Sequence, residues 1–455
     1  MTPDPTTAAF RFGFGLPLPH GALVDPAAML ADLATPDAMA LAHPGPRMSD
    51  MLAIMDASDD ALKISRRAEG STASDARQVY RGHIADLQTI ALNGIKSTVA
   101  RVLDAPDGLR ERLALFWADH FTTVAMGRRN AGLPGAMVDE AIRPHLAGRF
   151  ADLLRAAITH PAMLLYLDQT LSFGPGSRIG KKRGKGLNEN LARELLELHT
   201  LGAGSGYSQD DVRQMAELLT GLVVGKNGFR FDKRRAEPGA ETVLGVDYAG
   251  DTLEPVLAAL DDLAKRPETA RHMSRKLVVH FVSDTPDPSL LAEVVAAWAD
   301  TGGDLMAVYT ALLAHPSAWD PTPHKARQPF DFMIASLRAL GLRGGDVQGM
   351  AEGPFRRMIL APLAAMGQPW QAAPGPDGWA EQPEAWITPQ GMAARITWAM
   401  EMPGRLVQPL PDPVTLMQTA LGPRASEALI WAVPKSENVR EGVGLVLASP
   451  EFNRR

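Results

Sequence analysis

Segment Gly186–Thr220 holds the densest set of acid–base side chains at helical spacing, GLNENLARELLELHTLGAGSGYSQDDVRQMAELLT. A helix over its first part would turn a stripe of leucines toward the core. Glu194 and Glu197 would lie on one side of that stripe and His199 on the other. Two carboxylates three residues apart repel when both are ionised, which separates their pKa values as acid–base catalysis requires. These three residues are therefore candidate catalytic groups.

Two polar residues on the same helix could bind a substrate. Asn190 shares the edge that carries Glu194, and Arg193 lies four residues from both Glu189 and Glu197. The alternative is a solvent-exposed ladder of ion pairs, in which Arg193 bonds its two glutamates. We expect Glu194 to be more buried than Glu189 if it belongs to a site.

Asp119 and His120 form a second candidate catalytic pair. His120 falls on the apolar face of a predicted helix that also carries Phe116 and Trp117. The alternative is that His120 is a buried structural histidine whose ring only makes hydrogen bonds within the fold. No HExxH or ExxH pattern occurs, so zincin and di-iron sites gain no support. A divalent metal is compatible with the carboxylates, its ligands are left open, and no motif for an organic cofactor is present.

Segment 177–186 is rich in cations and glycines and runs directly into the predicted carboxylate helix. Basic side chains next to a helix N-terminus can hold a phosphate, a sulfate or a carboxylate. The segment lacks the GxxxxGK[ST] pattern of a nucleotide-binding loop. The alternative is a mobile surface loop. The candidate anion-binding residues are Arg178, Lys181, Lys182 and Arg183.

A loop rich in proline and glycine, residues 366–389, carries three of the eight tryptophans, Trp370, Trp379 and Trp386. Such a loop cannot bury three indoles within itself. We expect the rings either to pack on the helical body or to form stacking platforms for a sugar or a partner. Trp379 is the candidate for substrate contact.

The remaining periodicity is mostly helical, so we predict an all-α fold, a large multi-helix globular unit. Residues 221–248 predict a minor β-hairpin or small sheet, with Gly225–Gly228 as a turn. We treat 1–455 as one unit, with a possible division into 1–220, 221–250 and 251–455, the last containing the tryptophan loop. Predicted helices include Ile84–Leu103, Ala151–Leu167, Leu191–Leu201 and Ala270–Val282, and Ser208 should cap another.

Composition limits the function classes. The net charge of −6 gives no general positive field for nucleic acid, and the absence of cysteine excludes disulfides, thiol catalysis and cysteine-bound metals. No apolar run is long enough to span a bilayer, and the first residues do not form a signal peptide. The compartment is therefore left open, either cytoplasmic or periplasmic through a partner's signal.

Several motifs carry a resemblance to a known family. They are Arg11–Gly15, Phe116–Phe121, His160–Leu164, Leu187–Gly202, Gly206–Val212 and Ala448–Phe452. At these residues the chain resembles a bacterial family catalogued as domain of unknown function 1800. The resemblance implies a helical fold without a settled activity, and an association with a secreted sulfatase-like protein that is often encoded beside it. Where relatives often carry His-Asp before Pro-Gly, this chain has Ala236-Glu237.

Two functions follow as hypotheses. The first is a hydrolase-like enzyme that acts on an anionic or glycan substrate through the Glu/His/Asn cluster. The alternative is a non-catalytic helical scaffold, or a partner of the sulfatase-like protein, with the tryptophan loop as its docking surface. Convergence of Glu194, His120 and His199 in one cleft would favour the enzyme.

Overall fold

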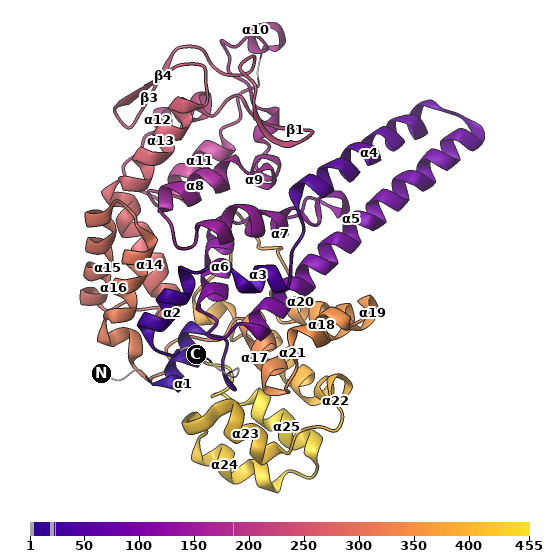
Figure 1. The fold of residues 1–455 in the computed structure, drawn as a ribbon, viewed down its shortest axis with the longest axis vertical. Helices are drawn as coiled ribbons and strands as arrows, with labels where there is room; N and C mark the ends of the chain where they lie inside the picture. Colours follow the sequence, from indigo (N-terminus) through magenta and orange to yellow (C-terminus); the bar gives the residue numbers. More distant parts are fainter. Residues whose placement is uncertain (1–3, 19–21, 23, 185) are drawn as a thin grey trace.

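The computed structural model describes residues 4–18, 22, 24–184 and 186–455. Helices stack into an elongated body, and one long pair of helices projects from it (Figure 1). The prediction of an all-α fold with a minor β region is confirmed. Among the described residues, none of the helices combines the length and the apolar character that crossing a bilayer requires.

Several helices begin with an Asp-Pro pair, a start signal that is visible in the sequence. The aspartate side chain accepts a backbone N–H of the first turn, while proline occupies the first helical position, where an N–H would lack a partner. The pairs open α2 (Pro26–Leu33), α15 (Pro288–Thr301) and α23 (Pro413–Leu421).

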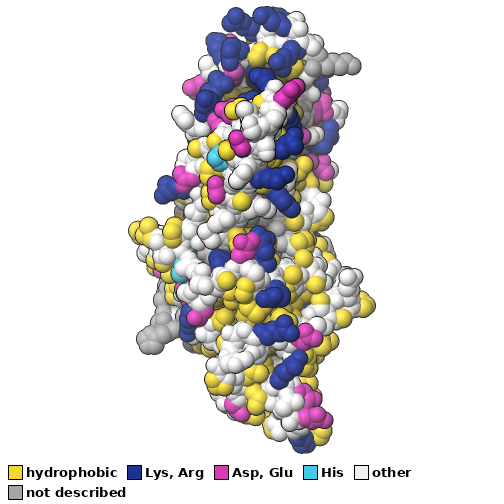
Figure 2. Space-filling model, turned by 90° about the vertical axis from the view of Figure 1, so that its right-hand side faces the viewer, with side chains coloured by type: hydrophobic (Ala, Val, Ile, Leu, Met, Phe, Trp, Pro, Cys, Tyr) yellow, Lys and Arg dark blue, Asp and Glu magenta, His cyan; other side chains and the backbone are white. Residues whose placement is uncertain are grey.

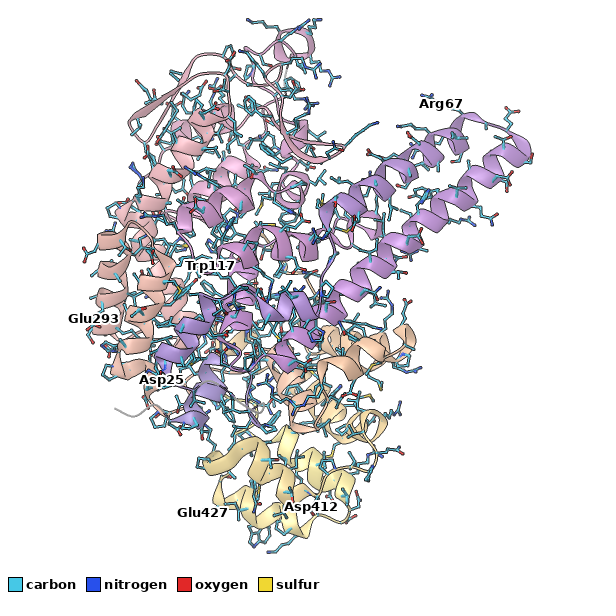
Figure 3. The ribbon with its side chains drawn as sticks, viewed as in Figure 1. Asp25, Arg67, Trp117, Glu293, Asp412 and Glu427 are labelled. Carbon is cyan, nitrogen blue, oxygen red and sulfur yellow. The ribbon has the colours of Figure 1, made fainter. Side chains whose placement is uncertain are left out.

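The larger of two hydrophobic clusters surrounds Trp117, Phe150 and Trp298, which are fully buried. Trp117 lies deep in the body (Figure 3), and its indole N–H donates to Tyr309 Oη at 2.7 Å. The helices of this cluster include α6 (Leu109–His120), α7 (Leu133–Met137), α8 (Phe150–Thr159), α9 (Pro161–Tyr166), α11 (Asn190–Glu197), α12 (Gln209–Leu218), α13 (Glu254–Lys265), α14 (Pro267–Phe281) and α16 (Leu305–Ala314).

The second cluster is built mainly from residues beyond Phe330 and contains Phe332, Trp398 and Phe452. Both hairpins of the β region contribute residues to the first cluster. The division of the chain into 1–220, 221–250 and 251–455 stays a prediction. The helices of the C-terminal part are α17 (Pro329–Ala339), α18 (Gly344–Gly349), α19 (Glu352–Phe355), α20 (Ala361–Ala365), α21 (Pro389–Glu401), α22 (Pro403–Leu406), α23 (Pro413–Leu421), α24 (Glu427–Ala432) and α25 (Val439–Ala448).

The projecting pair consists of α4 (Met48–Arg67) and α5 (Gly70–Asp104), and we call it the arm. Arg67 marks its far end (Figure 3). The near end of α5 enters the body, where Val99 and Leu103 join the second cluster. Three short helices complete the described N-terminal half, namely α1 (Pro5–Thr7), α3 (Ala38–Ala42) and α10 (Gly180–Arg183).

Two antiparallel hairpins form the β region, as the sequence predicts. Strands β1 (Leu222–Gly225) and β2 (Gly228–Phe231) pair with Gly225 opposite Gly228, so the predicted turn is confirmed. Strands β3 (Ala240–Val243) and β4 (Val246–Ala249) are joined by Leu244 and Gly245, which both have positive φ. Positive φ at both central residues is typical of a tight hairpin turn that matches the strand twist.

Three predicted helices differ in extent from the structure. Ile84–Leu103 is only the inner part of α5, and the helix predicted over Leu191–Leu201 ends, as α11, at Glu197. The stretch Ala151–Leu167 is divided into α8 and α9 at His160-Pro161. Proline supplies no N–H to the helix and disfavours helical geometry in the preceding residue, and His160 accordingly has an extended ψ of 136°. His160 Nδ1 instead accepts the N–H of Ala162 at 3.2 Å, so the histidine caps α9.

The predicted cap at Ser208 is confirmed as a complete capping box. Asp211 N–H donates to Ser208 Oγ at 3.1 Å, and Ser208 N–H donates to Asp211 Oδ2 at 2.8 Å. Asp211 Oδ1 also accepts the N–H of Leu244 at 2.6 Å, which ties the β3–β4 turn to the start of α12.

We expect Ser208→Ala to lower the free energy of unfolding by about 0.5–2 kcal/mol, because one N–H of the first turn of α12 loses its acceptor. Urea denaturation of the full chain measures the change. Ser74→Ala, at an exposed position within α5, is the matched control and should have little effect. Equal stability of the two variants would contradict the role given to the Ser208 cap.

Candidate functional site

A cavity of about 140 Å³ lies where the two hydrophobic clusters meet, and residues of the 366–389 loop form part of its wall. Its wall is mainly apolar, with a few titratable groups. The apolar and aromatic residues are Phe14, Leu115, Phe121, Met137, Ile142, Phe330, Leu363, Trp370 and Trp379, and the titratable ones are Arg112, Asp119, His280, Asp331 and Glu381.

Asp119, in the last turn of α6, is one of the carboxyl groups that line this cavity. The N–H of Trp379 donates to Asp119 Oδ1 at 2.9 Å, and Thr122 Oγ1 donates to the Asp119 carbonyl at 2.5 Å. Burial raises the pKa of Asp119 to about 7, although the Trp379 hydrogen bond and the nearby Lys276 act to lower it. A carboxyl group with this pKa can give or take a proton near neutral pH.

The tryptophan loop can approach Asp119 this closely because of Gly378. Its φ is +81°, and a Cβ at this position would lie 2.6 Å from the Asp119 carbonyl oxygen and 2.7 Å from Oδ2. Any larger residue would therefore push the loop away from the carboxyl group.

A second acid–base unit on the cavity wall consists of His280 and Glu381. His280 Nδ1 lies 2.5 Å from Glu381 Oε1, and Lys325 Nζ lies 2.8 Å from Glu381 Oε2. Burial lowers the pKa of His280 to about 4, whereas His280 and Lys325 hold the pKa of Glu381 well below its usual range against the opposing effect of burial. At neutral pH an ionised carboxylate therefore accepts the Nδ1 proton of a neutral imidazole.

This arrangement leaves the other ring nitrogen of His280 available. Nε2 is buried and makes no hydrogen bond within the described chain. A neutral imidazole that donates through Nδ1 carries a lone pair on Nε2, and a carboxylate behind it stabilises the imidazolium that forms on protonation. His280 therefore has the protonation pattern of a general base, with an unpaired lone pair on Nε2.

His120 and His199 link the ends of α6 and α11 beside the cavity rather than lining it. His120 Nε2 lies 3.3 Å from the His199 carbonyl, and His199 Nδ1 lies 3.2 Å from the His120 carbonyl. Burial lowers the pKa of both rings, that of His199 to about 3. Lys276 Nζ approaches His120 Nδ1 at 3.1 Å, and burial lowers its pKa as well. These two histidines therefore position the helix end that carries Asp119.

The sequence contains a signal for part of this site that the predicted site residues do not include. His272, Lys276 and His280 recur at every fourth residue of α14, so they share one face of that helix. His272 Nδ1 lies 2.9 Å from the Thr200 carbonyl, which extends the contacts of this face to the end of α11. Glu381 offers no comparable signal, because it lies in an irregular loop.

The two predicted carboxylates of α11 lie outside the cavity wall, so Glu194, His120 and His199 do not converge in this cavity as the enzyme hypothesis expected. Glu194 is half-buried, and burial together with Glu197 raises its pKa, with a further contribution from Asp377 of the tryptophan loop. Glu197 accepts a hydrogen bond from Tyr207 Oη at 3.1 Å. Glu189 is half-buried too, so the expectation that Glu194 is the more buried of the two is not confirmed.

The polar candidates on α11 are part of a surface network. Arg193 Nη2 lies 3.1 Å from Glu189 Oε2 and 3.2 Å from Gln209 Oε1, and Asn190 is exposed. Of the two ion pairs in the predicted ladder, Arg193 makes the one with Glu189, and it lies outside the cavity.

The basic candidates, Arg178, Lys181, Lys182 and Arg183, are all exposed. They belong to α10 and the turn before it, which lie at one extremity of the body, away from α6 (Figure 1). None of them lines the cavity.

The three tryptophans of the 366–389 loop pack on the body. Trp386 is buried and donates to the Ala380 carbonyl at 2.8 Å, and Trp370 lies against Phe330 with 5.1 Å between ring centroids. Trp379 is half-buried and, like Trp370, contributes to the cavity wall. Trp379 is thus the predicted binding residue that does reach the cavity.

The carboxylates of the sequence are compatible with a divalent metal. Within the described residues, no group of three or more His, Asp or Glu side chains is arranged to hold a metal ion. A metal therefore stays a prediction without assigned ligands, and the acid–base chemistry of the cavity is described through its side chains.

Because the pKa of Asp119 is raised, this residue should make the free energy of unfolding depend on pH. Its ordinary value in an unfolded chain is about 3.9, so between about pH 4 and 7 the folded protein binds more protons and loses stability as pH rises. Asp119→Asn removes this dependence. When the pH is raised from about 4.5 to about 8, wild type should lose on the order of 1–3 kcal/mol in free energy of unfolding relative to the variant.

Urea denaturation at both pH values measures this difference, and Asp75→Asn, an exposed carboxyl on the arm, serves as the control. A variant whose stability follows the same pH dependence as wild type would show that Asp119 titrates normally.

The comparisons with known proteins agree with the motifs of the sequence. A family model described as "Protein of unknown function (DUF1800)" matches residues 10–454, almost the whole chain. No match was found among curated proteins or among solved structures. The match covers the Arg11–Gly15 motif, the cavity and its loop. The chain therefore belongs to the DUF1800 family.

Proposed function

We propose that this protein is a hydrolase-like acid–base enzyme whose reaction takes place in the cavity beside the 366–389 loop. The observation that carries the proposal is that two carboxyl groups on one cavity wall have pKa values shifted in opposite directions. That of Asp119 is raised to about 7, and that of Glu381 is held well below its usual range. Such a divergence separates the proton donor from the groups that must stay ionised.

The roles follow from the protonation states. Asp119 gives its proton to the leaving group, while His280 Nε2 removes a proton from the attacking water molecule. Glu381 keeps the proton on His280 Nδ1 and stabilises the imidazolium that forms. Transfer of the surplus proton from His280 back to Asp119 through solvent restores both groups.

The size of the cavity limits which substrates can enter it. A closed apolar cavity of about 150 Å³ holds one benzene ring, so about 140 Å³ accepts a single ring or the end of a chain. Ionised Glu381 and Asp331 on the wall disfavour an anionic group inside it. A glycan or an anionic chain would therefore be attacked only at a neutral terminal group, with Trp370 and Trp379 against its apolar face.

We expect His280→Gln and Asp119→Asn each to lower kcat by about 10²- to 10⁴-fold, the usual contribution of a general base or acid. The measurement is hydrolysis of a panel of nitrophenyl esters, glycosides, phosphates and sulfates. Wild-type activity should fall below about pH 4, where His280 becomes charged, and above about pH 7, where Asp119 loses its proton.

His324→Gln is a matched control, because His324 Nε2 also bonds a carboxylate, Asp320 at 2.9 Å, but on the surface. This control should keep wild-type activity. Absence of turnover with every neutral compound, or full activity in both cavity variants, would argue against the proposal.

The arm supports a second candidate, a scaffold that binds a partner such as a sulfatase-like protein. Two antiparallel helices that project from the body offer a long surface, on which Ile64 and Val79 are exposed. A scaffold role would be independent of His280, so partner binding that survives His280→Gln in a protein without measurable turnover would favour this candidate.

A further inference from the structure

Two basic segments that are distant in sequence lie side by side at the end of the body that carries α10. Ile179 N–H donates to the Arg234 carbonyl at 3.1 Å, and Gly174 N–H donates to the Arg235 carbonyl at 2.8 Å. These bonds fasten segment 178–183, which has four cations and no carboxylate, to segment 230–235, which has four cations and one carboxylate. We call the charged side chains of both segments the basic end.

Only part of this charge is neutralised locally. Asp232 is buried and pairs with Arg230 at 3.4 Å and with Arg234 at 2.9 Å. Lys233 pairs with Asp251 at 2.9 Å. Among the described residues, the four cations of segment 178–183 have no ion pair within 4.0 Å, and Glu237, which accepts the Gly176 N–H at 2.7 Å, adds one negative charge beside them. Figure 2 shows Lys and Arg side chains gathered at this end of the molecule.

The net charge of the basic end is opposite in sign to that of the rest of the protein. Its two segments carry +4 and +3, and the whole chain carries −6, so the remaining residues carry −13. A negatively charged surface would therefore attract this end and repel the rest, which favours one orientation of approach. The cavity plays no part in this effect.

We propose that the basic end docks the protein on the surface of an anionic lipid membrane. Such a surface requires clustered lysine and arginine side chains that are free to reach headgroups, without a shaped pocket. An exposed apolar side chain lies next to the cluster, because Leu171 is 68% exposed and follows Thr170, whose carbonyl accepts Arg235 Nη1 at 2.6 Å. This residue offers a contact with the acyl boundary.

Nucleic acid fits the same charge less well. Helix α10 has four residues, too few to follow a DNA groove as a recognition helix does. Single-stranded nucleic acid is usually held on exposed aromatic stacking platforms, whereas Phe173 is buried and Phe231, within segment 230–235, is half-buried against the first cluster.

The test is co-sedimentation of the full chain with vesicles of phosphatidylcholine alone or mixed with phosphatidylglycerol. We expect binding to the mixed vesicles only, weakened by salt. The variant Lys181→Ala, Lys182→Ala, Arg183→Ala should bind about ten- to a hundredfold more weakly, because each cation near an anionic surface adds to the affinity. These side chains are exposed, so thermal unfolding should be unchanged.

A matched control removes the same charge elsewhere, with Arg66→Ala, Arg67→Ala and Arg77→Ala on the arm, all exposed. This control should bind mixed vesicles like wild type. Leu171→Ser should weaken vesicle binding and leave unchanged any binding to a soluble polyanion such as heparin. The proposal is overturned if both triple variants bind equally, if phosphatidylcholine alone suffices, or if the basic end selects heparin or an oligonucleotide and ignores vesicles. Vesicle binding requires no turnover, so the outcome is independent of the proposed activity.

Discussion

The buried carboxylate of Asp331 joins parts of the chain that are far apart in sequence. It lies 3.1 Å from Arg112 Nη1 and 3.2 Å from Arg455 Nε, and all three side chains are almost completely buried. Arg112 also donates to the Gly13 carbonyl at 2.9 Å through Nε, and Arg455 donates to the His280 carbonyl at 2.9 Å. Leaving a buried charge without its ionic partner is strongly destabilising, so this cluster demands that all these segments meet.

The cavity depends on the correct meeting of the segments that Asp331, Arg112 and Arg455 join. Arg112 and Asp331 form part of its wall, and Arg455 holds the backbone of His280, the residue to which we assign the general base. The arginines lower the pKa of Asp331 against the opposing effect of burial, so this carboxylate stays ionised and structural. Asp119 has Lys276 nearby but no arginine, and burial together with Glu381 and Asp377 raises its pKa, so it keeps its proton more readily. The same cavity thus gives its carboxyl groups different chemistry through the number of cations beside each.

Local features of the fold were accessible from the sequence. The Ser208 cap, the Gly225–Gly228 turn and the helix that carries Asp119 follow from short-range chemistry, which needs no knowledge of distant contacts. The division of the predicted Ala151–Leu167 helix is also readable from the sequence, because Pro161 disfavours helical geometry in the residue before it even where the apolar periodicity continues.

The composition of the site was less accessible. Asp119 and Trp379 are 260 residues apart, and the raised pKa of Asp119 comes from burial that only the folded chain creates. Glu381 belongs to an irregular loop without periodicity, so nothing in its neighbourhood points to His280. Glu194, which the helical pattern favoured, shows the opposite case, since a carboxylate beside an apolar stripe can still lie outside a cavity.

The arm has a consequence for the dynamics of the molecule. Along the first part of α5, up to Asp86, Ala76 is the single buried residue, so this part contacts little besides α4. Helix pairs held mainly by contacts that are local in sequence open without global unfolding. Amide hydrogens in the outer arm should thus exchange through local fraying, and those near Leu103 only through rupture of the second cluster. The arm is therefore a graded element, compliant at Arg67 and rigid where it enters the body.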